Sequence, residues 1–527
     1  MRFMRNALLT VIVILVLAAT SLWAITYWVK PHTFKIIAQK QLSNLTHQDS
    51  VFDGPITWRL LPRPGLHVTN VRIGNPEQTD TVYSLIVDHV LFNIQIKPLF
   101  RGQLVFDRLI LDGFKLSINP DATPYDLSQK KQLASSQKKH RSHPSMVSIK
   151  SLLLTNGQKI VNHNPLDRSV LNHVRLEAWF PQSKHEQVPI QLKAMLTNTS
   201  QTLPLQTELS YQGLIRLTPN IKETSTSLIN NLELDGQLTL QNIGFKKYEF
   251  SKANTHLVFN HKKLQLNPLT LSLYNGESIG QLTYQVDTKQ LEFNQTGTTL
   301  NAEPVSQTLF GDKLHLKGTL DFSIHALVHL DEPSWLKKSN LNGNLTLRDG
   351  TLTYVNLKAI THEATQTIRD LATQNLNIIQ ETLKHLKPWN INDYSGNTPF
   401  ELINLQYKTN NDGLLMYNLL LETKKLHLKG QGDLNLETHD VNAHLAANVL
   451  THDPTTQAIQ QLLVNGFPLK VNGKIDDLVV HVDSSMIRHL LSNGSLSKPL
   501  TQPLKLLQHH LKKLQSDSHD SKEATSE

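Results

Sequence analysis

The chain has no cysteine among its 527 residues. Disulfides, thiolate metal sites, iron–sulfur clusters and cysteine nucleophiles are therefore excluded. Charged residues are scarce, at 18% against about 25% in typical soluble domains. Lys and Arg (52) exceed Asp and Glu (44), for a formal charge of +8. Over this length the excess is mild, and a solvated basic surface explains it better than a nucleic-acid partner, which we do not expect.

Motifs for catalysis or cofactor binding are also missing. His362-Glu363 begins like a zinc-protease helix, but Gln366 stands where the second histidine should be. Gly430-Gln431-Gly432 is followed by Asn435 instead of a third glycine, which excludes a dinucleotide loop. The 25 histidines are scattered along the chain. We therefore expect no enzyme, no metal site and no cofactor.

One segment is apolar enough to cross a membrane. Residues Ala7 to Val29 carry no charge, and as a helix rising about 1.5 Å per residue they would span a hydrocarbon core of about 30 Å. Two arginines precede the segment, and the membrane-interface residues Trp23, Tyr27 and Trp28 stand at its far end. A cleaved signal peptide would have a shorter apolar stretch. We therefore favour a retained anchor, with residues 1–6 as a cytoplasmic stub and the body outside the cytoplasm.

Alternating apolar and polar residues dominate the rest of the chain. In the longest run, from Leu314 to Leu330, even positions are apolar apart from Gly318 and odd positions are mostly polar. Successive side chains of a strand point to opposite faces, so the pattern predicts a mainly antiparallel sheet with one buried face. One long strand, or two with a bend at Gly318, would explain this run equally well. Asn275-Gly276 and Asp349-Gly350 lie between such runs and predict hairpin turns.

Few helices are expected. Helical patterns cover residues 32–45, 363–387 and 454–465, and a basic amphipathic helix near the C-terminus is compatible with lying on a membrane or capping the sheet. The predicted organisation is a stub (1–6), an anchor (7–29), an N-terminal β region (30–120), a disordered basic loop (121–145), a central β region (146–340), a C-terminal β region with the two later helices (341–495), and an amphipathic helix with a polar tail (496–527).

Several short motifs follow one another in a characteristic order. They include Gly54 to Trp58 (GPITW), Leu61 to Leu66 (LPRPGL), Ile96 to Leu99 (IKPL), Leu273 to Gly276 (LYNG) and Phe467 to Lys474 (FPLKVNGK). This order resembles the AsmA family of Gram-negative inner-membrane proteins, with Asn275 replacing one glycine of the family's Leu-Tyr-Gly-Gly turn. The resemblance is densest over residues 60–480, although residues 120–230 match poorly.

The resemblance implies a single-pass inner-membrane anchor and a periplasmic body. That body would be a long, curled β-groove of the bridge-like lipid-transfer type with a few short capping helices. The implied partners are phospholipids and the inner membrane, with the far end meeting the outer membrane directly or through a partner. The implied role is phospholipid transport toward the outer membrane and outer-membrane assembly.

A sheet with one apolar face must hide that face, and the expected helices are too few to cover it. Curling around acyl chains is one solution, because each buried methylene contributes about 0.8 kcal/mol. The alternative is a closed β-sandwich that acts as a non-catalytic scaffold or assembly factor for outer-membrane proteins. In the groove model the candidate lipid-lining residues are Phe92, Ile94, Ile96, Leu314, Leu316, Leu320, Phe322, Ile324, Val328, Leu428 and Leu434.

Overall fold

The protein is mainly β. The computed structural model describes residues 50–59, 63–74, 83–95, 106–118, 149–164, 167–181, 187–199, 205–217, 232–245, 248–310, 315–330, 338–353, 355–372, 389–390, 393–410, 413–450, 466–475 and 477–483, with single residues at 35, 39 and 457. Within these residues, 23 strands belong to one sheet. The described helices longer than a single residue are α6 (Ala302–Phe310) and α7 (Leu357–Ala372). The predicted fold class is confirmed at this level.

The chain divides into two compact units, which we call unit 1 (Met1–Lys262) and unit 2 (Lys263–Glu527). The strands of unit 1 are β1 (Ser50–Phe52), β2 (Ile56–Arg59), β3 (Gly65–Ile73), β4 (Tyr83–Ile94), β5 (Phe106–Ile118), β6 (Ile149–Asn164), β7 (Asp167–Trp179), β8 (Val188–Asn198), β9 (Leu205–Leu217), β10 (Leu232–Phe245) and β11 (Tyr248–Asn260).

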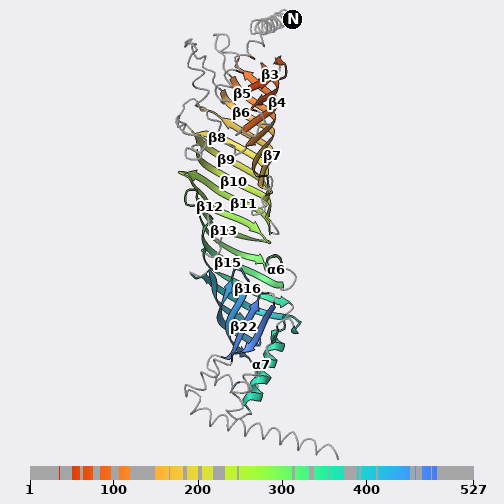
Figure 1. Ribbon diagram of the computed structural model, residues 1–527, viewed down its shortest axis with the longest axis vertical. Coiled ribbons are helices and arrows are strands. Elements are labelled where there is room, and N and C mark those ends of the chain that lie inside the picture. Colours follow the sequence, from red (N-terminus) through yellow and green to blue (C-terminus); the bar gives the residue numbers. More distant parts are fainter. Residues whose placement is uncertain are drawn as a thin grey trace, which may run out of the picture. The chain divides into compact units, whose positions relative to one another are not determined.

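Within unit 1 the strands pair mostly with their neighbours in sequence (Figure 1). The short strands β1 and β2 both pair with β3. One pair departs from the expected antiparallel pattern, because β5 and β6 are parallel. Parallel neighbours need a connection of a dozen or more residues to return the chain to the same end of the sheet. Residues 119–148 supply that length, and they include the predicted loop 121–145, which lies outside the described residues.

The strands of unit 2 are β12 (Lys263–Leu273), β13 (Gly276–Gln285), β14 (Gln290–Asn301), β15 (His315–His329), β16 (Asn340–Thr353), β17 (Trp389–Asn390), β18 (Thr398–Thr409), β19 (Leu414–Glu422), β20 (Leu426–Asn435), β21 (Asp440–Val449), β22 (Phe467–Lys474) and β23 (Asp477–Val482). They pair antiparallel in chain order with one exception. The two-residue strand β17 leaves β16 to pair with β18 and itself pairs with β23.

The two predicted turns had different outcomes. A hairpin joins β12 to β13 through Tyr274 and Asn275, which both have positive φ, as a two-residue type I′ turn requires. The prediction for Asp349-Gly350 is wrong, because both residues lie inside β16. Asp349 has a φ of 49°, and the pairing with β15 shifts between Lys317 and Thr319. This stretch of sequence therefore encodes a β-bulge.

Residues with positive φ line up across neighbouring strands, at some positions together with a bulge. In unit 1, Asn70, Gly113, Asn156 and His173 have positive φ on β3, β5, β6 and β7, at nearby register positions. In unit 2, Thr299, Gly318 and Asp349 form such a row on β14, β15 and β16. A bulge bends its strand and increases the local twist. The long run from Leu314 is thus one strand, β15, with an irregularity at Gly318.

The row of positive-φ residues in unit 2 is also stabilised by a hydrogen bond and an ion pair to Asp321. The Thr299 N–H donates to Asp321 Oδ1 over 2.8 Å, and Arg348 forms an ion pair with the same carboxylate. Burial opposes ionisation of Asp321, but these two partners outweigh it and lower the pKa of the carboxyl group. The bend therefore has its own electrostatic support on the polar side of the sheet.

The remaining predicted helices lie partly or wholly outside the described residues. The helix expected at 363–387 begins earlier, at Leu357, and residues 373–388 lie outside the described part of the chain. The expected anchor 7–29 and the helices at 32–45 and 454–465 fall almost entirely on residues that are not described, as does the C-terminal segment 496–527.

The bulge at Asp349 can be tested by substitution. Asp349→Val should destabilise the protein by about 1–2 kcal/mol, because a β-branched residue tolerates a positive φ poorly. Asp349→Gly should be neutral or slightly stabilising. The measurement is the unfolding midpoint in urea. Thr351→Val, a similar change at an ordinary position of the same strand, is the control, and equal effects of the two Val variants would contradict the assignment.

Candidate functional site

The register of unit 2 places apolar side chains on one face from strand to strand. On β15 this face carries Leu320, Phe322, Ile324, Ala326 and Val328. Residues directly opposite one another in a sheet share a face, so the pairings carry the assignment onward. Across β12 to β19 the face includes Leu264, Leu266, Leu269, Leu271, Leu273, Leu282, Leu291, Phe293, Leu300, Leu341, Leu345, Leu347, Ile403, Leu405, Tyr407, Leu415, Tyr417 and Leu419. We call this set, with the five residues of β15, the open apolar face.

Much of the open apolar face is only half-buried. Leu266, Phe293, Phe322, Ile324 and Leu405 all retain partial exposure, although they lie on the apolar side of central strands. Among the described residues no second sheet packs on this face, and α6 packs beside β15. Half-exposed apolar side chains in a continuous row are the chemistry that favours an apolar ligand.

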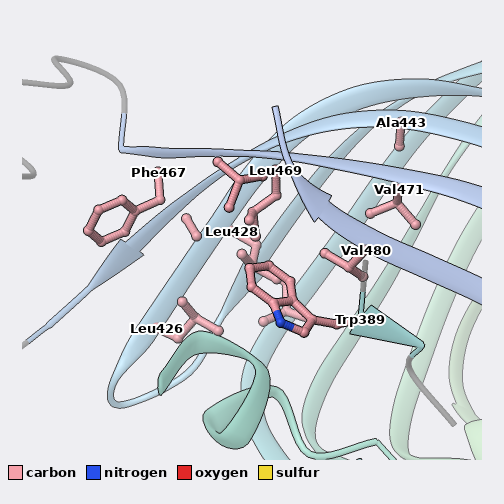
Figure 2. Packing of buried hydrophobic residues seen from close by; sticks show 11 residues of the cluster. Trp389, Leu426, Leu428, Ala443, Phe467, Leu469, Val471 and Val480 are labelled. Carbon is pink, nitrogen blue, oxygen red and sulfur yellow. The ribbon is translucent and has the colours of Figure 1, made fainter. Parts of the chain in front are cut away.

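The face changes character beyond β19. Around β20 to β23 it becomes a tight cluster, which we call the closed section: Trp389, Leu421, Leu426, Leu428, Ala443, Ala447, Phe467, Leu469, Val471, Val480 and Val482. Figure 2 shows Trp389 lying among Leu426, Leu428 and Val480. Trp389 is 9% exposed and Phe467 is 1% exposed. Strand β17 brings the indole in from a distant part of the chain, so this end of the face is a dry core.

Unit 1 also has closed clusters on its apolar face. One joins Phe52, Val68, Val87, Val90 and Phe114 from β1, β3, β4 and β5 with residues of β7 and β8. A second joins Leu66, Ile94 and Phe106. The core of unit 1 is therefore well packed at its first strands.

Gln295 is a buried polar residue on the open apolar face; its amide nitrogen is hydrogen-bonded, whereas its Oε1 has no hydrogen-bond partner among the described residues. Gln295 of β14 is 3% exposed. Its Nε2 donates to Ser278 Oγ over 2.8 Å and to the Leu269 carbonyl oxygen over 3.2 Å. The register of β12 shifts between Leu266 and Leu269. Gln295 thus ties the irregular part of β12 to β13, which accounts for an amide among leucines.

The opposite face of unit 2 is polar. Asn404 donates to Asn344 and Thr346, and Asn472 donates to Asn442. Hollows of about 260 and 600 Å³ in this part of the sheet are lined mainly by amide and lysine side chains such as Gln406, Lys408 and Asn418. Within the described part of the chain, no group of three or more His, Asp or Glu is placed to hold a metal ion. The expectations of no metal and no cofactor stay predictions.

The predicted groove residues fall into three groups. Leu316, Phe322, Ile324 and Leu434 are half-buried on the apolar face of unit 2, where Leu320 and Val328 are buried more deeply, at 4% and 5% exposure. Leu428 belongs to the closed section, Ile94 to the Leu66 cluster, and Phe92 packs against that cluster. Ile96, Leu314, Trp23, Tyr27 and Trp28 lie outside the described residues.

Sequence reasoning missed the leucines of β12. Leu264 and Leu266 occupy even positions, whereas Leu269, Leu271 and Leu273 occupy odd ones. The register shift between Leu266 and Leu269 brings both sets to the same face. A bulge reverses the alternation of apolar and polar residues, so the leucines of this strand do not form an unbroken period-2 pattern. The Asn267-Pro268 pair inside the run is the signal that could have found it.

A comparison with protein-family models links the chain to known proteins. The model of the AsmA family matches residues 1–203. This part of the chain is similar to the AsmA family. The match ends within unit 1, so the open apolar face of unit 2 lies beyond the matched AsmA segment. No curated protein and no solved structure matches the chain.

Membrane attachment is not visible in the described residues. Across residues 50–483 with their gaps, none of the helices combines the length and the hydropathy that a bilayer crossing needs. The segment 7–29, where the AsmA-like anchor is expected, lies outside the described part.

The closed section can be tested at Trp389. Trp389→Ala should destabilise β20 to β23 by about 3–5 kcal/mol, because it leaves a large cavity in a packed cluster. Hydrogen exchange of the β22 and β23 amides would measure the loss of protection. Trp179 of β7 is 38% exposed, so Trp179→Ala is the matched control with little expected effect. Unchanged protection in the Trp389 variant would contradict a packed closed section.

A second prediction concerns Tyr417 on the open apolar face. Burial, with a smaller contribution from the Asp433 carboxylate, raises the pKa of Tyr417 to about 12. The folded state keeps this proton longer than the unfolded state, whose tyrosines ionise near 10.0. The contribution of Tyr417 to the free energy of unfolding is therefore fully present below pH 10 and is lost as the pH rises toward 12. An ultraviolet absorbance titration should show a late component that Tyr417→Phe removes, and an unchanged titration in that variant would contradict the burial.

Proposed function

We propose that this protein is a lipid carrier whose open apolar face holds the acyl chains of phospholipids. In this proposal it is anchored in the bacterial inner membrane with its body in the periplasm. There it assists phospholipid transport toward the outer membrane and outer-membrane biogenesis without a catalytic step. The AsmA match over residues 1–203 supports this assignment.

One observation carries the proposal. Most apolar side chains of β12 to β19 remain half-exposed on a continuous face, where a soluble protein would normally cover them. An acyl chain lying on this face would bury its methylenes at about 0.8 kcal/mol each, while its headgroup stays in water. Such contacts are non-directional, so a chain can shift along the face at little cost.

The scaffold alternative needs a different arrangement. A closed β-sandwich packs two sheets face to face, with their inner side chains interdigitated. The described strands instead belong to one sheet, and tight packing is concentrated in clusters such as the closed section. These observations favour the carrier over the scaffold.

The proposal is tested with Ile324→Asp. The full chain is purified and the phospholipids that accompany it are counted by mass spectrometry. Several phospholipids per wild-type chain are expected, with a strong loss in the variant, because a carboxylate on the apolar face must stay hydrated. Ser323→Asp introduces the same charge on the opposite face of β15 and should leave the lipid count unchanged. A lipid-free wild-type protein, or a folded Ile324→Asp protein with the wild-type number of phospholipids, would contradict the carrier model.

A further inference from the structure

Three aromatic residues of the open apolar face lie beside glycines on neighbouring strands. Phe322 of β15 is directly opposite Gly297 of β14. Tyr407 of β18 is opposite Gly343 of β16, and Tyr417 of β19 is opposite Gly432 of β20. The register thus repeats one arrangement three times within unit 2.

The Phe322 ring occupies the space that a side chain at position 297 would need. A Cβ added to Gly297 would lie 2.9 Å from both Cδ1 and Cζ of Phe322 and closer still to Cε1. These three ring atoms are the nearest neighbours of that position, with no backbone atom among them. The ring must therefore extend sideways over the backbone of β14, because it lies where a Cβ would project from the sheet.

The tyrosines also lie near their glycines, although the atom nearest to an added Cβ is there a backbone carbonyl oxygen, of Ser323 at Gly343 and of Asn442 at Gly432. A Cβ on Gly343 would meet Tyr407 Oη at 2.5 Å, and one on Gly432 would meet Tyr417 Oη at 2.7 Å. Tyr407 Oη donates a hydrogen bond of 3.2 Å to the Ser323 carbonyl oxygen of β15. Its ring therefore crosses β16, and its polar atom is tied to the backbone. An apolar ligand on this face would contact ring carbons.

We propose that these three pairs form a floor on which an unbranched acyl chain rests, and that the missing side chains of the glycines set its height. This inference rests on the carrier function proposed above. A methyl group at position 297 would push the Phe322 ring up into the space that the acyl chain uses. Phe322 and Gly297 are then positioning residues for lipid occupancy.

The test uses the full chain with vesicles of phosphatidylethanolamine and phosphatidylglycerol that carry a trace of phospholipid with a diazirine on its acyl chain. After irradiation, cross-linked peptides are quantified along β12 to β19. Gly297→Ala should lower this cross-linking about tenfold, the effect of displacing about two methylenes at about 0.8 kcal/mol each. Gly244→Ala is the matched control, because a Cβ on Gly244 of β10 would meet no atom within 4 Å.

The decisive comparison is with Gly297→Ala/Phe322→Ala. If the displaced Phe322 ring excludes the acyl chain, removing the ring restores cross-linking to within about twofold of wild type. If Gly297→Ala only damages the fold, the second substitution lowers cross-linking further. A double variant no better than Gly297→Ala, or a folded Gly297→Ala protein with normal cross-linking, overturns the floor and leaves the carrier function standing. Absence of cross-linking in the wild type overturns both.

Phe322→Ala alone covers the case in which Gly297→Ala does not fold. This variant needs no extra room, and removal of the ring should expose Gly297 to the probe. New cross-links on the β14 peptide that contains Gly297 would support the floor. An unchanged cross-link map in a folded Phe322→Ala protein would overturn it.

Discussion

The hydrogen-bonded register between strands is the constraint on which this structure depends. Opposite residues share a face, so the apolar side chains of β15 determine which residues of β14 and β16 must also be apolar. A slip of one residue would turn a whole strand's leucines to the polar side. Where a strand does gain a residue, as at Thr299 or Asp349, the extra residue takes a positive φ and the alternation resumes beyond it.

The apolar face of unit 2 is tightly packed at one end and half-exposed along the rest. At β20 to β23 it is sealed, because β17 inserts Trp389 against residues such as Leu428 and Val480. From β12 to β19 the described residues leave most of it half-exposed, including Phe322 and Ile324. The closed section stabilises the fold through buried apolar contacts, and the half-exposed part keeps apolar surface available for a ligand. The proposed carrier function depends on this division.

Aromatic rings give the open part its particular surface. They lie beside glycines, where the absence of a Cβ lets a ring cross a neighbouring strand, and Tyr407 directs its hydroxyl to the backbone. The cost of burying the phenol is visible in Tyr417, whose pKa is raised to about 12 by burial. Glycine on an apolar face therefore reflects a packing arrangement as well as a flexible backbone.

The sequence by itself determined the mainly β class, the sidedness of β15 and the Asn275 turn, because period-2 alternation and turn chemistry are local properties. It also carried the AsmA resemblance that the family match supports. Only the tertiary structure decided that Asp349 forms a bulge, that β5 and β6 are parallel, and that Trp389 pairs with β23. It alone separated Ile324 on the open face from Leu428 in the closed section, since both have the same local pattern and differ in what distant segments pack against them.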